Sequence, residues 1–407
     1  MPQGSFGWVL SVTRVVVTGL GLVLPHGIGL QAADAVFRGR SAVRRLPGMA
    51  GLDDATGAPL LELDPPAGTE QADRALQFAA AAADEAWKTA GLDSRHIDMS
   101  RVAAVLSLSK GAIVGLAARH SLPRAEQGPW LDLAPDAGTR LVAARLGLGG
   151  PLGSPITACA SGAHALAWGV KLIEHGVADF ALVGAAEASL HPMVIGSYMR
   201  MGVLADGGDD PASSVRPFSA TRRGFAIGEG AGVLVLESAS VAARRGARGY
   251  AEVAGLALGT HAGGLTGMEP SGESLARLAS MALERAGVRP AEVDYVNAHG
   301  TATAGNDLAE ARAIRLALGP AADGVSVSST KGAHGHLLGA AAAVELVLAV
   351  LAMGRGEVPP TANLTDPDPE IRLDCTPLAP RRRPLRCVLK LASGFGGQAA
   401  AICLIAG

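Results

Sequence analysis

The sequence is organised around the stretch Pro155-Ile156-Thr157-Ala158-Cys159-Ala160-Ser161-Gly162-Ala163-His164. A short apolar run at 153–156 leads into it, and a predicted helix follows. In residues 159–174 the apolar side chains recur at the i, i+3, i+4, i+7 spacing of an amphipathic helix, and Gly176 marks its end. Because a helix N-terminus carries partial positive charge, we expect the pKa of the Cys159 thiol to fall below its usual value of about 8.5. This position favours a nucleophilic role for Cys159. The alternative is that Cys159 is a small buried hydrophobic residue, which is the usual role of a lone cysteine.

The composition is that of a densely packed α/β protein. The 407 residues are 49% hydrophobic, 18% charged and 3% aromatic, with 54 glycines. This length allows two or three domains, or one large duplicated unit. The formal net charge of −2 argues against a nucleic-acid partner, which would require a basic face.

Cysteine usage and hydropathy bear on the compartment. No CxxC pair and no metal-ligand spacing occur among Cys159, Cys375, Cys387 and Cys403, which favours a reduced, cytoplasmic protein over a secreted one. The first eleven residues lack Lys, Arg and a long apolar core, unlike a secretory signal. Residues 337–353 are the most apolar stretch, but Glu345 interrupts them, so we expect a buried helix and no membrane insertion.

The order of predicted elements indicates duplication. Apolar runs predict strands at 12–22, 101–108, 180–185 and 231–236, and residues 76–90 predict a helix, in a layered α/β fold. The end of a predicted helix and the strand after it, at 83–105, have a counterpart at 281–297. The apolar run, Cys159 and the helix after it have a counterpart in a strand at 327–331 followed by a helix from about His336. We therefore expect two halves, 12–250 and 251–407, packed as one rigid body. Cys159 and the 331–336 loop would occupy equivalent turns facing one cleft.

Three further motifs carry chemistry: Asn-Ala-His-Gly-Thr-Ala-Thr at 297–303, Ser-Thr-Lys-Gly-Ala-His-Gly-His-Leu-Leu-Gly-Ala at 329–340, and Ser-Gly-Phe-Gly-Gly at 393–397. Each has an ordinary explanation, since a histidine after a strand is often structural and a glycine run is often a turn. His334 and His336 could form a metal pair, but no third ligand has suitable spacing. Taken together with Cys159, the motifs supply what attack on a thioester needs: a thiolate, oxyanion donors and groups that hold an enolate.

With these four motifs in this order, the sequence resembles the β-ketoacyl-acyl-carrier-protein synthases of the thiolase superfamily. The matching motifs are 157–162, 298–303, 330–339 and 394–397, and the resemblance extends from about Val12 to Leu404. It is with the elongating branch, which includes the β-ketoacyl synthase II type and the ketosynthase α subunits of type II polyketide systems. The resemblance implies a thiolase fold, a five-layered αβαβα sandwich of two duplicated halves. It also implies a homodimer, or a heterodimer with a homologous ketosynthase-like subunit.

The resemblance implies a decarboxylative Claisen condensation, with roles for the motif residues. Cys159 takes the acyl group from an acyl carrier protein as a thioester, and the backbone N–H groups of Cys159 and Phe395 form the oxyanion hole. His299 and His336 hydrogen-bond the malonyl thioester carbonyl, so that loss of CO2 leaves a stabilised enolate. An acyltransferase of this type uses acyl and malonyl thioesters as substrates.

The remaining implied roles concern support and binding. Lys331 orders the site through Glu345, and Thr301 and Thr303 contact the pantetheine arm. The phosphopantetheine arrives on the carrier protein, so the resemblance implies no metal or organic cofactor of the enzyme's own. Phe225 is expected near the acyl pocket. Thiolases differ in using a second cysteine where this sequence has Phe395.

Two departures from the fatty-acid pattern bear on the pathway. The aromatic gate of the acyl pocket is replaced by Ser393, which resembles the polyketide ketosynthase α subunits. An arginine that meets the carrier protein is missing from 204–208, and the arginines that could compensate are Arg74, Arg216, Arg222 and Arg223. These features favour a specialised polyketide, polyene or unusual fatty-acid pathway. The alternatives are housekeeping fatty-acid elongation, a non-catalytic subunit that resembles a chain-length factor, and a cysteine hydrolase, which would leave Lys331 and His336 unexplained.

Overall fold

The computed structural model describes residues 13–407 apart from 50, 53, 121–129 and 262–263. One continuous mixed sheet passes through it, and each half of the chain contributes one side. From the centre outward, the first half contributes β1 (Val15–Leu24), β9 (Gly230–Ser238), β7 (Phe180–Glu187), β5 (Val102–Leu108) and β6 (Leu152–Gly153). The second half contributes β10 (Ala251–Thr260), β16 (Gln398–Ala406), β15 (Cys387–Ser393), β11 (Tyr295–Asn297) and β12 (Ser326–Ser328).

The two halves have the same topology. Numbered within its own half, each set of strands runs first, fifth, fourth, second, third from the centre outward. The directions also agree: the two central pairings of each half are antiparallel and the two outer pairings are parallel. The halves meet where β1 pairs with β10 at their first residues. This repeated order of strands confirms the predicted duplication.

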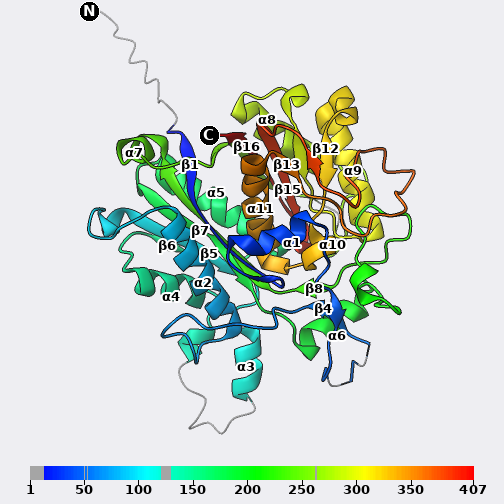
Figure 1. The fold of residues 1–407 in the computed structure, drawn as a ribbon, viewed down its shortest axis with the longest axis horizontal. Coiled ribbons are helices and arrows are strands. Elements are labelled where there is room, and N and C mark those ends of the chain that lie inside the picture. Colours follow the sequence, from blue (N-terminus) through cyan, green and yellow to red (C-terminus); the bar gives the residue numbers. More distant parts are fainter. Residues whose placement is uncertain (1–12, 50, 53, 121–129, 262–263) are drawn as a thin grey trace, which may run out of the picture.

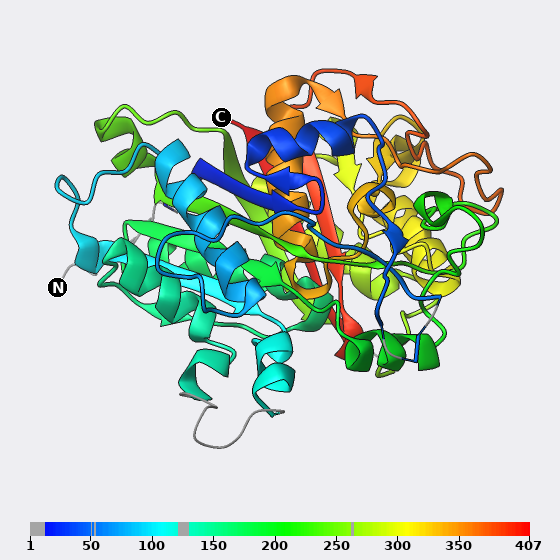
Figure 2. The same ribbon diagram turned by 60° about the horizontal axis from the view of Figure 1, so that its bottom comes forward.

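The strands of each half form one layer of sheet, and in the described part of the chain helices form the other three of the five layers. The central layer consists of α5 (Ser161–Glu174) and α11 (Ala341–Arg355). The outer layers are α2 (Arg74–Thr89) with α4 (Ala137–Leu146) on the first half, and α8 (Glu273–Ala286) with α9 (Ala304–Leu318) on the second. Figure 1 shows α5 and α11 in the middle of the molecule, and in Figure 2 the cyan and the yellow-to-red elements lie on opposite sides.

Small residues allow these layers to approach closely. A Cβ at Gly162 of α5 would lie 2.4 Å from the backbone nitrogen of Ala343 in α11. Each half also has a register shift in its first strand, and Gly19 and Gly255 follow these shifts. A Cβ at either glycine would lie within 2.3 Å of a carbonyl oxygen of the outer helix, α2 or α8. The many glycines and alanines of the sequence therefore set the spacing of the layers.

The strands predicted at 101–108, 180–185 and 231–236 and the helix at 76–90 are confirmed, as is the strand at 12–22 from Val15 onward. Residue 12 lies outside the described residues. Two boundaries were wrong. The strand β6 stops at Gly153, and the helix expected from His336 begins at Ala341, after α10 (Lys331–His334) and the 3-10 turn η9 (Leu338–Ala340). Gly335, with φ of 71°, ends α10 and adopts a conformation that favours glycine.

One helix in the described part of the chain, Leu338–Arg355, is long and apolar enough to cross a membrane, but 83% of it is buried. It contains α11 and packs against α5 and β9. The expectation of a buried helix at 337–353 is therefore confirmed.

Candidate active site

The duplicated halves contain equivalent turns at the centre of the molecule. After β6, the 3-10 turn η5 (Ala158–Ala160) leads into α5, and after β12, the turn η9 leads into α11. Both turns begin with a residue of positive φ, 48° at Ala158 and 45° at Leu338, which is a strained conformation for a side chain with a Cβ. The second residue is Cys159 in one turn and Gly339 in the other. The equivalent of Cys159 is therefore Gly339, and the 331–336 loop, which was predicted to occupy the equivalent turn, lies immediately before it.

His336 is fixed by its backbone. Its N–H donates to Ala226 O at 2.8 Å, and its carbonyl oxygen accepts from Gly228 N at 3.0 Å. Its ring packs edge-on against Phe225, with centroids 4.8 Å apart, and is 5.4 Å from the ring of His299. The residue is 1% exposed, so the ring has one defined position at the wall of the site.

His299, which follows β11, is held by buried charges. Its backbone N–H donates to Glu310 Oε1 at 2.6 Å, and the next N–H, of Gly300, donates to Glu310 Oε2 at 2.7 Å. Its carbonyl oxygen accepts from the Lys331 ammonium, which also lies 3.4 Å from Nδ1 of the ring. Glu310 was not identified in the sequence, because α9 also contains Asp307, Arg312 and Arg315, and one more charged residue in such a helix is no signal.

Lys331 belongs to a buried ionic cluster. Its ammonium lies 2.5 Å from Glu345 Oε1, as the resemblance implied, and the other oxygen of Glu345 lies 2.6 Å from the ammonium of Lys390. All three side chains are completely buried. Although burial alone would raise the pKa of Glu345, the two ammonium groups outweigh it and lower this pKa below its usual value. Glu345 therefore carries its negative charge.

The hydrogen bonds assign the same tautomer to both histidines. Burial and then the charge of Lys331 lower the pKa of His299 and His336 well below the usual value, so both rings are neutral at pH 7. An ammonium only donates, so Nδ1 of His299 accepts from Lys331, and Nδ1 of His336 accepts from Leu338 N at 3.2 Å. In each ring the proton is then on Nε2. Both side chains can therefore donate a hydrogen bond through Nε2.

The electrostatics of Cys159 differ from the expectation. Burial raises the pKa of its thiol to about 11, and the positive charges of Lys110 and Lys331 only partly offset this. A helix terminus is worth typically about 0.3–1 kcal/mol, less than one pKa unit, whereas full burial shifts a pKa by up to about 3–5 units. The predicted lowering was therefore wrong: the resting residue is a thiol, 7% exposed.

The glycine motif at 393–397 lies against the cysteine turn. A Cβ at Gly394 would lie 3.0 Å from the backbone nitrogen of Cys159, so glycine is needed for this approach. Gly396 and Gly397 have φ of 77° and 79°, which turns the chain back immediately after Phe395. The motif that was predicted to supply an oxyanion donor thus abuts the nucleophile's own amide.

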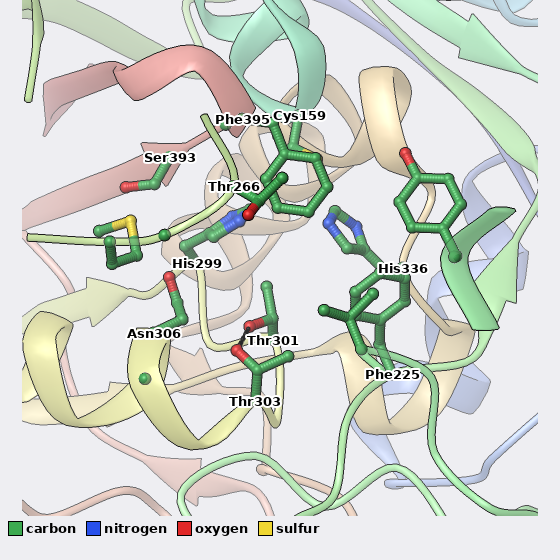
Figure 3. A pocket seen from close by; sticks show the side chains of 16 residues that line it. Cys159, Phe225, Thr266, His299, Thr301, Thr303, Asn306, His336, Ser393 and Phe395 are labelled. Atoms are coloured by element: carbon green, nitrogen blue, oxygen red, sulfur yellow. Dashed lines mark hydrogen bonds between the residues drawn. The ribbon is translucent and has the colours of Figure 1, made fainter. Parts of the chain in front are cut away.

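One cavity of about 210 Å³ is lined by Cys159, His299, His336, Gly394 and Phe395, whereas Lys331 and Glu345 are not part of its lining. Figure 3 shows Cys159 and Phe395 on one side of it, and His299 and His336 below them. Other predicted residues line the same cavity: Thr301, Thr303, Phe225 and Ser393. The hydroxyls of the two threonines are 2.8 Å apart, and the Ser393 hydroxyl is buried without a hydrogen-bond partner among the described residues.

Comparison with known proteins agrees with this geometry. The family model "Beta-ketoacyl synthase, N-terminal domain" matches residues 12–242, and "Beta-ketoacyl synthase, C-terminal domain" matches residues 250–365. The chain belongs to the beta-ketoacyl synthase family. It is 39% identical to a "Putative polyketide beta-ketoacyl synthase 1" of Streptomyces cyaneus, over 96% of this chain and 97% of that protein. It is 34% identical to a "3-oxoacyl-[acyl-carrier-protein] synthase 2" of Synechocystis, over 96% and 97% of the two chains.

Solved structures of ketosynthases have the same fold as this synthase. A type II polyketide synthase ketosynthase, in complex with its acyl-carrier protein and bound to the hexaketide, superposes with a TM-score of 0.90 at 33% identity. The match covers 98% of this chain and all of that one. The ishigamide ketosynthase/chain length factor superposes with a TM-score of 0.89 at 31% identity, over 98% and 100% of the two chains.

Some residues of this synthase that were predicted to contact the carrier protein, or considered as metal ligands, make other contacts. Arg222 is 7% exposed and ion-paired with Asp368 at 2.5 Å, so its prediction as a carrier contact was wrong. Arg74 is ion-paired with Glu229 at 2.8 Å, but its side chain is 32% exposed, so Arg74, Arg216 and Arg223 stay predicted carrier contacts. The ring nitrogens of His334 bond Gly335 O and Thr330 Oγ1, each at 2.8 Å, within its own turn.

Sequence reasoning also missed side chains at the site of this synthase. Tyr198 lines the cavity and contacts Phe225 and Phe395, with ring centroids 5.8 and 6.2 Å apart. Lys390 lies in the apolar strand β15, where a lysine is unusual enough to have been a signal. Tyr198 had no such signal, because an aromatic residue in a helix is common.

Proposed function

We propose that the chain catalyses the decarboxylative Claisen condensation of an acyl group on Cys159 with malonyl-acyl carrier protein, in a specialised polyketide, polyene or unusual fatty-acid pathway. The product is a β-ketoacyl-carrier and CO2. One observation carries this proposal: a cysteine thiol and two neutral imidazoles, each with Nε2–H as its donor, surround one cavity of about 210 Å³.

In the first half-reaction, Cys159 Sγ bonds to the acyl carbon and the thioester bond to the carrier breaks. The thiol proton passes to the departing pantetheine sulfur, so charge balances. The negative charge on the tetrahedral oxygen is stabilised by the backbone N–H groups of Cys159 and Phe395. Because burial raises the pKa of the Cys159 thiol to about 11, the proton must leave the sulfur as it attacks, since the thiolate is the nucleophile.

In the second half-reaction, the malonyl thioester carbonyl accepts hydrogen bonds from Nε2 of His299 and of His336. The bond to the carboxylate breaks, CO2 leaves, and its electron pair forms an enolate that these donors stabilise. The enolate carbon then attacks the acyl carbonyl, and the Cys159 thiolate departs and takes up a proton from solvent, which restores the resting thiol. Because the two imidazoles supply the electrophilic stabilisation, we propose that the reaction needs no metal or organic cofactor held by this chain.

We propose that the carrier's pantetheine arm passes Thr301 and Thr303, which line the same cavity as Cys159. The serine at the gate position, Ser393, lines the same cavity and is smaller than an aromatic gate. This supports a substrate bulkier or more polar than a saturated fatty acyl chain. The curated relatives named as polyketide synthases support the same pathway.

We further propose that the chain acts in the cytoplasm with a second thiolase-fold subunit. The strand β6 ends the sheet, and its residue Leu152 is 46% exposed. Two further apolar side chains beside it in sequence or on α5 are exposed, Ile156 at 52% and Trp168 at 44%. An open strand edge with apolar neighbours supports pairing with another subunit.

The proposal is tested by intact-mass spectrometry of the purified chain with malonyl-carrier and acyl-carriers of graded length. Acylation of Cys159 followed by a β-ketoacyl-carrier product supports condensation. Loading of short, unsaturated or β-keto chains, or activity that requires an added homologous subunit, supports the specialised pathway, whereas loading of long saturated chains indicates fatty-acid elongation. Free acid without extension would identify a hydrolase, and failure to load in any combination would identify a non-catalytic subunit.

A further inference from the structure

Lys390 is a completely buried ammonium that the proposed reaction does not use. It occupies the middle of β15, among the apolar side chains of the strand sequence Cys-Val-Leu-Lys-Leu-Ala-Ser. Removing an ammonium from water costs several kcal/mol unless hydrogen bonds and an opposite charge compensate it. The chain provides both, because Nζ donates to Glu345 Oε2 at 2.6 Å and to Leu391 O at 2.6 Å.

The two ammonium groups share a single carboxylate. Glu345 Oε1 lies 2.5 Å from Lys331, which contacts His299, and Oε2 lies 2.6 Å from Lys390. Burial lowers the pKa of Lys390, and the carboxylate of Glu345 opposes this change. With both lysines protonated, two positive charges and one negative charge give this cluster a net charge of +1. Without Lys390, the charge of Lys331 would be cancelled by Glu345, and the cluster would be neutral.

We propose that Lys390 is a positioning residue for the condensation, which keeps a net positive charge behind His299 and holds Glu345 between the two ammonium groups. This inference rests on the proposed function, in which His299 stabilises an enolate. A positive charge in a buried site stabilises a developing anion more strongly than it would in water. The same charge opposes protonation of Nδ1 of His299, which has to accept from Lys331.

The other charged and titratable groups around His299 allow this assignment. Burial and the charges of Lys331 and Lys390 lower the pKa of His299, as would protonation of His336. Glu310, on α9, accepts from the backbone of His299, and burial raises its pKa to about 7. Burial also lowers the pKa of His334, to about 3, so that ring is neutral beside Glu345.

The test compares Lys390→Met, Glu345→Gln and the double variant, with Lys88→Met as the matched control. Lys88 is an exposed lysine of α2, so its variant removes the same charge away from the site. By the charges above, Lys390→Met makes the cluster neutral, whereas the double variant returns it to +1 through Lys331 alone. Malonyl-carrier decarboxylation is measured from pH 4.5 to 8, and thermal unfolding monitors the fold. If Lys390→Met does not fold, Lys390→Gln takes its place.

We expect Lys390→Met to lower the decarboxylation rate at pH 7 about tenfold, because a neutral cluster no longer stabilises the enolate. The double variant should recover most of this rate, and Lys88→Met should keep the wild-type rate. An unchanged rate in Lys390→Met, or a double variant no faster than Lys390→Met, would show that Lys390 only supports packing.

A second measurement separates this inference from the proposed function. The pKa of His299 is followed by NMR in the full chain labelled at the histidine rings, which needs no turnover. A higher pKa in Lys390→Met, restored in the double variant, supports the inference even if the wild type decarboxylates nothing. In that case only the proposed function fails. An active wild type with the same His299 pKa in all variants would overturn the role of Lys390 alone.

Discussion

A methyl group at Gly394 would press on the amide that we propose as an oxyanion donor. In the Gly394→Ala variant the Cβ would lie 3.0 Å from Cys159 N, 2.9 Å from Thr157 O and 3.2 Å from Ala160 N. Ordinary van der Waals contact begins at 3.4 Å. All three neighbours are backbone atoms, which cannot rotate away as a side chain could. The cysteine turn and the glycine motif must therefore separate by a few tenths of an ångström.

The expected cost follows from this displacement. Removal of one oxyanion donor lowers kcat by about 10²–10³-fold, and a displaced donor should lose part of that, so we expect a fall of about 10–100-fold in condensation. Overpacking of this kind destabilises a protein by about 1–3 kcal/mol. Malonyl decarboxylation should change much less, because its enolate is held by the histidines and not by Cys159 and Phe395.

The assay measures condensation and decarboxylation separately, by product mass and by CO2 release, together with thermal unfolding. The matched control is Gly354→Ala in α11, where a Cβ would meet nothing within 4 Å. That substitution should leave both rates unchanged and stabilise the helix by up to about 1 kcal/mol. Equal loss of both rates in Gly394→Ala, or no loss in either, would refute the assignment of the oxyanion site to this contact.

Three further substitutions or titrations examine the same site. Cys159→Gln should lower condensation by at least about 10³-fold and keep malonyl decarboxylation, because the amide can mimic an acylated cysteine. Continued elongation, detected by product mass, would exclude Cys159 as the nucleophile. Alkylation of Cys159 by iodoacetamide should accelerate about tenfold per pH unit between pH 7 and 9, because the pKa of the thiol is raised to about 11; a plateau below pH 8, followed by peptide mass, would instead indicate a stabilised thiolate. Ser393→Phe should reduce loading of bulky acyl chains about tenfold relative to short ones, since the side chain would occupy the cavity; an unchanged preference among acyl-carriers would contradict its role as the gate.

The sequence was sufficient to predict the duplication, because the repeat is written in local patterns. The helix end at 83–92 and its counterpart at 281–288 both precede a strand, and the structure places these strands at equivalent positions of the two halves. Periodicity and turn residues act over a few residues, so a single chain carries them. The motif histidines and Cys159 were likewise identified, and they line one cavity.

The side chains that sequence reasoning missed depend on contacts between distant segments. Lys390 became significant only when β15 placed it 2.6 Å from Glu345, 45 residues earlier in the chain. The prediction of a lowered pKa for Cys159 was wrong for the same reason. A helix N-terminus is visible in the sequence, but the burial whose effect on the pKa is larger comes from packing of the two halves. Desolvation is a property of the assembled core, and local patterns do not report it.

The duplicated turn explains how one architecture supplies both the nucleophile and the electrophilic donors. In η5 the residue after the strained Ala158 is Cys159, whose side chain enters the cavity. In η9 the equivalent residue is Gly339, where a Cβ would lie 2.4 Å from Cβ of Ser109, so no nucleophile fits there. Its N–H instead donates to Glu187, and the chain three residues earlier provides His336. After duplication, each copy of the turn could thus keep its backbone shape while close contacts with Ser109 and Glu187 gave the second copy a different chemical role.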